Sequence, residues 1–102
     1  INGELEALAM TLPKVFRALK PGGMLAVISF HSLEDRIVKR FMRKMSGRPQ
    51  HRGDRSFVAE RTAYAEMVQS KAIFPRKDEV ESNPKSRSAR LRVLKKIRHP
   101  EF

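Results

Sequence analysis

The stretch MLAVISFHSLEDR, residues 24–36, contains the change of pattern that decides the fold. Residues 24–30 are apolar at almost every position and too few for a convincing helix, and Val27, Ile28 and Phe30 favour a strand. A strand without polar alternation is usually buried on both faces, as in a parallel sheet covered by helices. Directly after it come histidine, serine, two acids and an arginine, so a polar turn is expected to follow the strand.

An amphipathic helix is predicted on each side of this strand. Residues 3–20 carry apolar side chains at spacings of three and four, and Asn2 is a suitable N-cap. Pro13 lies inside this segment, so we expect a kink there or a second helix that starts near Thr11. After the strand, a helix is predicted from about residue 33 to residue 46. The order of helix, turn, buried strand and helix is typical of α/β folds.

The C-terminal half is predicted to consist mainly of loops and short strands. Residues 47–66 are a long polar connection whose order the sequence leaves open, with room for a short helix around residues 59–67. A short strand is predicted at residues 67–74, followed by a turn-rich loop at 75–84. From residue 88 onward, apolar and basic residues alternate. This alternation indicates a half-buried strand, antiparallel or at a sheet edge, with Ala89, Leu91 and Val93 on one face and Arg90 and Arg92 on the other.

The charge of the chain is strongly positive and unevenly distributed. Its 102 residues include 22 Lys and Arg against 11 Asp and Glu, a formal net charge of +11. Residues 36–62 contain nine basic and two acidic residues, and residues 85–98 contain seven basic and no acidic ones. Two separate basic blocks favour a polyanionic partner such as RNA, DNA or an anionic membrane surface, although a solvated basic face is the simpler alternative.

Composition and spacing exclude several kinds of site. The chain has no cysteine, which excludes disulfides and thiolate metal sites and fits a reducing cytoplasm. His31, His51 and His99 lack metal-ligand spacing. No apolar run approaches the roughly 20 residues of a membrane span, and no signal peptide is visible. Because the chain begins at Ile1, we expect a fragment, a processed product or trimmed ends.

The polar stretch at residues 29–36 has two interpretations, which do not exclude each other. In the first, Ser32 caps the following helix, and Glu34 and Asp35 lie in its first turn, where acids are favoured by the helix dipole. In the second, the stretch binds a ligand, because ligands of open α/β sheets lie outside the carboxyl ends of the parallel strands.

Three segments carry a resemblance to a known family. They are INGELEAL at the start of the chain, LKPGGMLAVISFHSLEDRIVKRF at residues 19–41, and KAIFP at 71–75 followed by NPKSRSARLRV at 83–93. Together they resemble the C-terminal part of the ribosomal RNA small subunit methyltransferase H family, and the resemblance covers nearly the whole chain. That family transfers a methyl group from S-adenosylmethionine to N4 of a decoding-centre cytidine in 16S rRNA.

The resemblance implies that residues 1–102 form the C-terminal part of a Rossmann-like class I methyltransferase domain with an α/β fold. Residues 24–30 would be the fifth strand, 67–74 the sixth and 88–97 the seventh. S-adenosylmethionine would be bound mainly by an N-terminal half absent from this chain, since the chain lacks the Gly-rich loop after a first strand and the acid that binds the cofactor ribose. No cofactor-binding, metal-binding or catalytic residue is therefore assigned.

The resemblance also implies where the substrate binds. The seventh strand runs antiparallel to its neighbours, so its start should share a rim with the end of the fifth. The candidate base- or phosphate-contacting residues at this rim are His31, Glu34, Asp35, Arg36, Asn83 and Arg87. In the alternative, Arg36 or Arg87 only pairs with Glu34 or Asp35 and ties the loops together. The candidate RNA phosphate contacts are Lys39, Arg40, Arg43, Lys44, Arg90 and Arg92.

The predicted function is that of an S-adenosylmethionine-dependent rRNA (cytosine-N4)-methyltransferase when full length, with this piece inactive alone. Its partner would be 16S rRNA or the small ribosomal subunit in the cytoplasm, with no membrane involved. One alternative is a basic RNA-binding module without catalysis. Another is a structural piece that associates with itself, because a partial sheet leaves an unpaired edge and apolar faces exposed.

Overall fold

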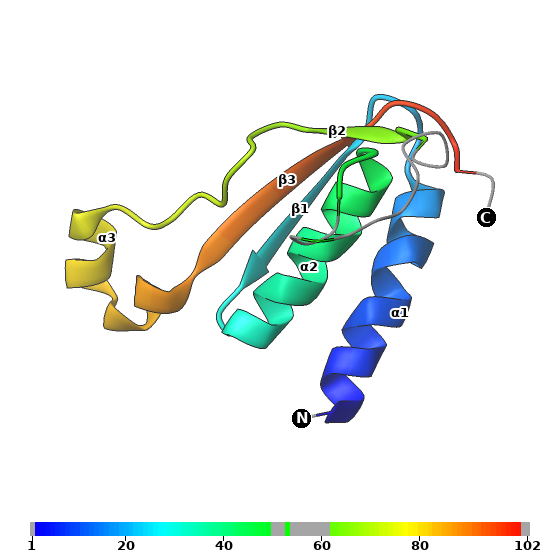
Figure 1. Ribbon diagram of the computed structural model, residues 1–102. Coiled ribbons are helices and arrows are strands. Elements are labelled where there is room, and N and C mark those ends of the chain that lie inside the picture. The colour runs from blue at the N-terminus through cyan, green and yellow to red at the C-terminus, as the bar shows by residue number, and fades with distance from the viewer. Residues whose placement is uncertain (1, 50–52, 54–61, 101–102) are drawn as a thin grey trace.

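Two helices pack against one face of a three-stranded sheet (Figure 1). The computed structural model describes residues 2–49, 53 and 62–100. The elements in chain order are α1 (Asn2–Ala18), β1 (Met24–Ser29), α2 (Ser32–Met45), β2 (Ala65–Met67), α3 (Lys77–Ser82), the 3-10 helix η2 (Pro84–Ser88) and β3 (Arg90–Lys96). The predicted α/β class is confirmed. Within these ranges no helix has both the length and the apolar character needed to cross a membrane.

The first helix is continuous although Pro13 lies inside it, so the predicted second helix from Thr11 is wrong. Leu12 and Phe16 on either side of the proline are buried in the core, and this packing holds both halves of the helix together. Pro13 cannot donate to the carbonyl of Ala9. Because Ala9 is exposed, water can satisfy that carbonyl.

The last strand lies in the middle of the sheet. The strand order is β1-β3-β2, and β3 is antiparallel to both neighbours. The predicted antiparallel direction is confirmed, and the alternative placement at a sheet edge is wrong. The strand predicted at residues 67–74 is shorter and earlier: β2 covers Ala65–Met67, and a single bridge joins Ile73 to Leu91. The helix suggested for residues 59–67 is wrong where it overlaps β2, and residues 59–61 lie outside the described part of the chain.

The turn-rich segment predicted at residues 75–84 contains a helix, α3, and leads into η2. Two acids, Asp78 and Glu79, lie in the first turn of α3, where they complement the helix dipole. The Arg76 side chain, which precedes the helix, pairs with both of them. Pro84 starts η2, where a missing N–H costs nothing. Proline and polar residues therefore mark helix boundaries here rather than an irregular loop.

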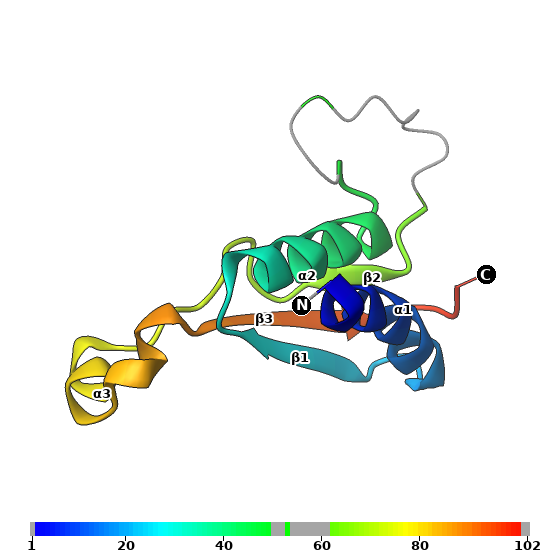
Figure 2. The ribbon, with the colours of Figure 1, turned by 90° about the horizontal axis from the view of Figure 1, so that it is seen from below.

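Within the described residues, helices cover only one face of the sheet (Figure 2). Leu25 and Ser29 of β1 face the helices and are buried, whereas Met24 and Ile28 on the opposite face are 58% and 59% exposed. The prediction that this strand is buried on both faces is therefore wrong for the described structure. The opposite face is nevertheless apolar, since Ile28 pairs with Leu91 of β3. The predicted self-association would depend on this uncovered face.

The face of β3 under the helices carries basic residues, contrary to the expectation from simple alternation. Arg92 is 9% exposed and Lys96 is fully buried, with buried Leu94 between them. The apolar Leu91 and Val93 are only half-buried on the other face. Buried cations are tolerated where each one finds anionic or dipolar partners, and both of these cations do.

Lys96 reaches the C-terminal end of α1. Its Nζ donates to the carbonyl oxygens of Phe16 at 2.9 Å and Arg17 at 3.2 Å, and also to that of Leu19. These carbonyls lie at the end of the helix, where intrahelical donors run out and the dipole is negative. Burial lowers the pKa of Lys96 below its ordinary value of 10.5, while the carbonyls oppose this shift because they stabilise the charged form.

The second helix begins with a cap that differs from the predicted one. The Nδ1 atom of His31 accepts a hydrogen bond from the backbone N–H of Leu33 at 3.0 Å, so His31 and not Ser32 is the N-cap. Glu34 accepts in return from the backbone N–H of Phe30 at 3.2 Å, an arrangement similar to a capping box. Ser32 is already the first helical residue, and so it cannot be the cap.

Candidate functional site

Asp35 lies in the first turn of α2 and connects the ends of two strands. Arg92 donates to its two carboxylate oxygens, from Nε at 2.8 Å and from Nη2 at 3.0 Å. This bidentate pair is the strong geometry for guanidinium and carboxylate. Arg90 places a second guanidinium 3.6 Å from the same carboxylate, and the Ser29 hydroxyl donates to it at 3.5 Å.

The charge on Asp35 is stabilised by these neighbours. The hydrogen bond from Arg92 holds the pKa of Asp35 below its ordinary value of 3.8, against the desolvation that raises it. The side chains of Asp35 and Arg92 are only 10% and 9% exposed. Asp35 is therefore an ionised group that holds the fold together at the rim and offers little surface to a ligand.

This ion pair joins the two motifs that the sequence makes conspicuous, SFHSLEDR and NPKSRSARLRV. Ser29 at the end of β1 pairs with Arg90 at the start of β3, so the two strand ends lie at the same end of the sheet, as predicted (Figure 1). That this rim binds substrate stays a prediction. In the alternative interpretation of the sequence, Arg36 or Arg87 pairs with Glu34 or Asp35. The structure shows different partners. Asp35 is held by Arg90 and Arg92, and not by Arg36 or Arg87. Because Arg92 is buried on Asp35, we do not retain it as a phosphate contact.

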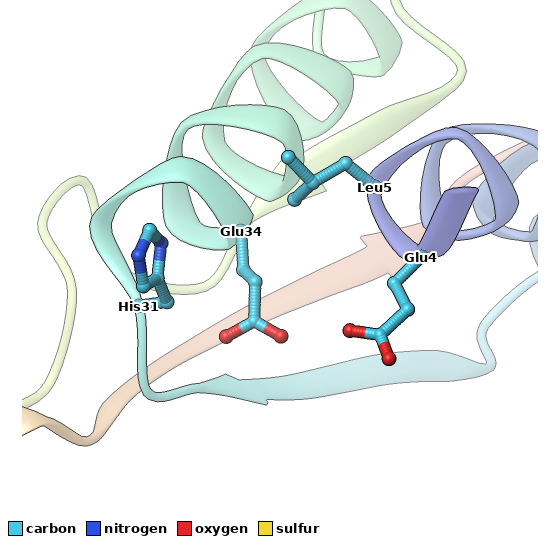
Figure 3. A pocket seen from close by; sticks show the side chains of 4 residues that line it. All are labelled: Glu4, Leu5, His31 and Glu34. Atoms are coloured by element: carbon cyan, nitrogen blue, oxygen red, sulfur yellow. The ribbon is translucent and has the colours of Figure 1, made fainter. Parts of the chain in front are cut away.

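His31 and Glu34 line a small hollow between the starts of α1 and α2 (Figure 3). The hollow has a volume of about 180 Å³ and is completed by Glu4 and Leu5. In Figure 3 the carboxylates of Glu4 and Glu34 point to the same side. Glu4 was not predicted as a site residue, because only the packing of α1 beside α2 brings it near the rim. The carboxylate oxygens of Glu4 and Glu34 are acceptors, which suits a ligand that carries an amino group, whereas the acceptor nitrogen of His31 is already used by the Leu33 N–H.

The other predicted rim residues lie elsewhere. Asn83 lies between α3 and η2 and Arg87 within η2, and both are exposed. Neither lines the hollow that contains His31 and Glu34. Arg36 is exposed on α2. The six predicted substrate contacts therefore share one end of the sheet but do not form one cluster.

A larger hollow lies between the basic face of α2 and residues 70–74. It has a volume of about 450 Å³, and its lining residues are Lys39, Arg43, Arg48, Ser70, Lys71, Ala72, Phe74 and Arg92. None of these described lining residues is acidic. Lys39 and Arg43 were predicted as RNA contacts, whereas Arg48, Lys71 and Phe74 were not. Phe74 belongs to the KAIFP segment, three residues after Lys71. An aromatic residue close to a lysine was the signal in the sequence that could have indicated an RNA contact here.

The remaining predicted cations of α2 lie outside this hollow. Arg40 and Lys44 are exposed on the helix, and neither contributes to the lining. Arg43 is half-buried, and its Nε donates to the carbonyl oxygen of Pro49. The basic face of α2 thus combines cations in the hollow with cations that project freely into solvent.

Comparison with known proteins assigns the chain to a family. The sequence model of the MraW methylase family matches residues 1–97. The chain belongs to the MraW methylase family. This family has a Rossmann-like methyltransferase fold, and β1, α2, β2 and β3 correspond to the C-terminal portion of its sheet.

Curated relatives agree with this assignment. The chain is 50% identical over 101 residues to ribosomal RNA small subunit methyltransferase H of Ruegeria sp. (strain TM1040), covering 91% of this chain and 29% of the relative. It is 41% identical over 97 residues to the protein of that name from Parabacteroides distasonis, covering 95% of this chain and 31% of the relative. It is 44% identical over 101 residues to the protein of that name from Granulibacter bethesdensis, covering 96% of this chain and 30% of the relative. The chain spans about 30% of the length of these relatives.

The described residues do not form the cofactor loop of this fold. In Rossmann-like folds a Gly-rich turn after a strand lets the backbone approach the cofactor. Here Gly22 and Gly23 precede β1, and the turn after β1 contains phenylalanine, histidine and serine. No S-adenosylmethionine contact is therefore assigned to the described part of this chain.

Proposed function

We propose that the protein containing this chain is an S-adenosylmethionine-dependent methyltransferase that modifies N4 of a decoding-centre cytidine in 16S rRNA. The observation that carries the proposal is the match of residues 1–97 to the MraW methylase family, together with relatives named for small-subunit rRNA methylation. The basic hollow beside α2 supports an RNA partner, because Lys and Arg clusters neutralise backbone phosphates. Such a substrate implies a cytoplasmic site of action.

In this proposal the chain supplies RNA contacts and part of the pocket for the target base. An exocyclic amine is a weak nucleophile, because its lone pair is delocalised into the ring, so orientation must supply much of the rate. A carboxylate near N4 would stabilise the positive charge that develops there. Glu4 and Glu34 are candidates for that acceptor, with His31 beside them. Arg36, Asn83 and Arg87 would contact the RNA farther along the rim.

Methyl transfer is the direct test. The protein expressed from the complete gene is incubated with S-adenosylmethionine carrying a labelled methyl group and with small subunits that lack the modification. Nucleoside mass spectrometry is expected to detect labelled N4-methylcytidine in 16S rRNA. Residues 1–102 alone are expected to transfer no label. RNA binding by the complete protein without any transfer would instead favour a non-catalytic RNA-binding module.

Removing charge from α2 is expected to weaken RNA binding in a salt-dependent way. Replacing Lys39 and Lys44 with glutamine should flatten the plot of log affinity against log salt concentration by about one unit for each lost phosphate contact. The measurement is the dissociation constant of a 16S rRNA fragment from about 50 to about 200 mM salt. Lys14→Gln with Lys20→Gln in and after α1 removes the same charge and should change the slope less. Equal slopes for the two double variants would place the RNA surface elsewhere.

A further inference from the structure

Phe74 is an exposed aromatic ring held in place at the edge of the basic hollow. It is 58% exposed, and the guanidinium carbon of Arg90 lies 5.8 Å from the ring centre. Arg90 is itself held 3.6 Å from the Asp35 carboxylate. The neighbouring Ile73 exchanges backbone hydrogen bonds of 2.8 and 2.9 Å with Leu91. The ring is therefore fixed by a cation and by its backbone while more than half of it remains in solvent.

Two different hollows meet at this ring. The basic hollow includes Lys39, Arg48 and Lys71, and none of these three forms an ion pair with a carboxylate in the described part of the chain. The second hollow, of about 290 Å³, contains the apolar side chains of Ile28, Ile73 and Leu91 beside Phe74. The acid in its lining, Glu79, is paired with Arg76 at 3.2 Å. An anionic group would be stabilised on the first side, and a flat, weakly polar group on the second.

A nucleotide combines these two chemistries, with an anionic phosphate linked through a sugar to a flat base. Aromatic rings next to basic grooves bind single strands because every unpaired base offers a face for stacking. In a duplex, the bases are already stacked on their neighbours, and their faces are not accessible to a protein ring. A nucleic acid bound around Phe74 would therefore have to be single-stranded to use the ring.

We propose that Phe74 stacks on an unpaired base of single-stranded RNA while Lys39, Arg48 and Lys71 contact the adjacent phosphates. This inference rests on the proposed function only in taking RNA as the partner. Stacking does not depend strongly on base identity, so this contact holds and orients the strand without reading its sequence. Asp35 acts indirectly, since it fixes Arg90 and Arg90 lies over the ring.

The test compares two matched substitutions in the protein expressed from the complete gene. Phe74→Leu removes the proposed platform, and Phe30→Leu removes a phenylalanine that is 57% exposed but lies outside both hollows. Affinities are measured for a single-stranded RNA and for a duplex of the same length. Phe74→Leu is expected to weaken single-strand binding by about 5-fold to 150-fold, the range for stacking one base, and to leave duplex binding unchanged.

Two further variants separate stacking from charge. Phe74→Trp should retain single-strand affinity, because indole also stacks. Lys71→Gln should weaken binding of both single strand and duplex, because phosphates are present in both. Melting temperatures measured by circular dichroism show whether each variant is folded.

The proposal is overturned if Phe74→Leu binds single-stranded RNA as tightly as Phe30→Leu does, or if it loses single-strand and duplex affinity equally. The methylation assay keeps this result separate from the proposed function. A protein that methylates 16S rRNA but tolerates Phe74→Leu retains the proposed activity and loses the stacking platform. A protein that transfers no methyl group but depends on Phe74 for single-strand binding retains the platform and loses the proposed activity.

Discussion

Replacing Asp35 with alanine is expected to lower the free energy of unfolding by about 3–5 kcal/mol, because it leaves a buried guanidinium without its counter-ion. Arg92 is 9% exposed, and both of its hydrogen bonds to a carboxylate are made to Asp35. Alanine is a good helix former, so the weakening of α2 itself is limited to the lost first-turn charge, about 0.3–1 kcal/mol. Urea denaturation of the protein expressed from the complete gene measures the difference.

Asp78 provides a matched control for this substitution. Like Asp35, it lies in the first turn of a helix and pairs with an arginine, Arg76, at 3.3 Å. Its side chain, however, is 69% exposed, so Asp78→Ala should cost no more than about 1 kcal/mol. Combining Asp35→Leu with Arg92→Met should recover much of the stability, because apolar residues of similar size can replace a buried ion pair. Equal losses for Asp35→Ala and Asp78→Ala would show that burial of the pair contributes nothing.

The same pair makes stability depend on pH in a defined direction. The pKa of Asp35 is held below its ordinary value of 3.8, chiefly by the hydrogen bond from Arg92. The stabilisation is then fully present above pH 3.8 and is lost as the pH falls through the lowered value. The stability difference between wild type and Asp35→Ala should therefore be constant near neutral pH and shrink below pH 3.8.

If Asp35 also contacts substrate in the proposed reaction, Asp35→Asn should lower the methylation rate by more than the drop in its melting temperature explains.

Replacing Lys96 with alanine is expected to lower the free energy of unfolding by about 2–5 kcal/mol, the cost of emptying a buried site the size of a long aliphatic side chain. The stem of Lys96 is fully buried, and its ammonium lies 5.2 Å from the centre of the Phe16 ring. Lys96→Met keeps the stem and removes only the donor, so it should cost about 1–3 kcal/mol, the cost of leaving carbonyls at the end of α1 without a partner.

Lys95 supplies the control, since it lies on the same strand but on the opposite face. Lys95 is only partly buried, so Lys95→Ala should cost about 1 kcal/mol or less, the usual size for a single substitution outside the core. Urea denaturation and hydrogen exchange in the last turn of α1 can follow all three variants. A Lys96→Met variant as stable as wild type, with unchanged exchange near Leu19, would show that water caps this helix end equally well.

The two long helices and the first and last strands could be predicted from the sequence to within a few residues, whereas α3 and η2 were not. Apolar spacing located α1 and α2, and the apolar run before SFHSLEDR located β1, because both patterns reflect which side chains must leave water. The direction of β3 and the shared rim came from the family resemblance, and the pairing of Ser29 with Arg90 agrees with it. The position of β2 was harder to predict, since three residues give too short a pattern to separate a strand from a loop.

The role of the charged residues was decided only by the tertiary structure. In the sequence, Arg90, Arg92 and Lys96 are three similar cations on an alternating strand. In the fold, Arg92 is bound to a carboxylate 57 residues away, Lys96 caps a helix whose last turn lies 77–80 residues away, and Arg90 lies over Phe74. A cation can be buried only where distant groups supply its partners, and local spacing does not contain that information. The sequence by itself determined α1, α2, the first strand and the strongly basic character. Long-range packing determined which of those charges hold the fold together and which remain free to bind a partner.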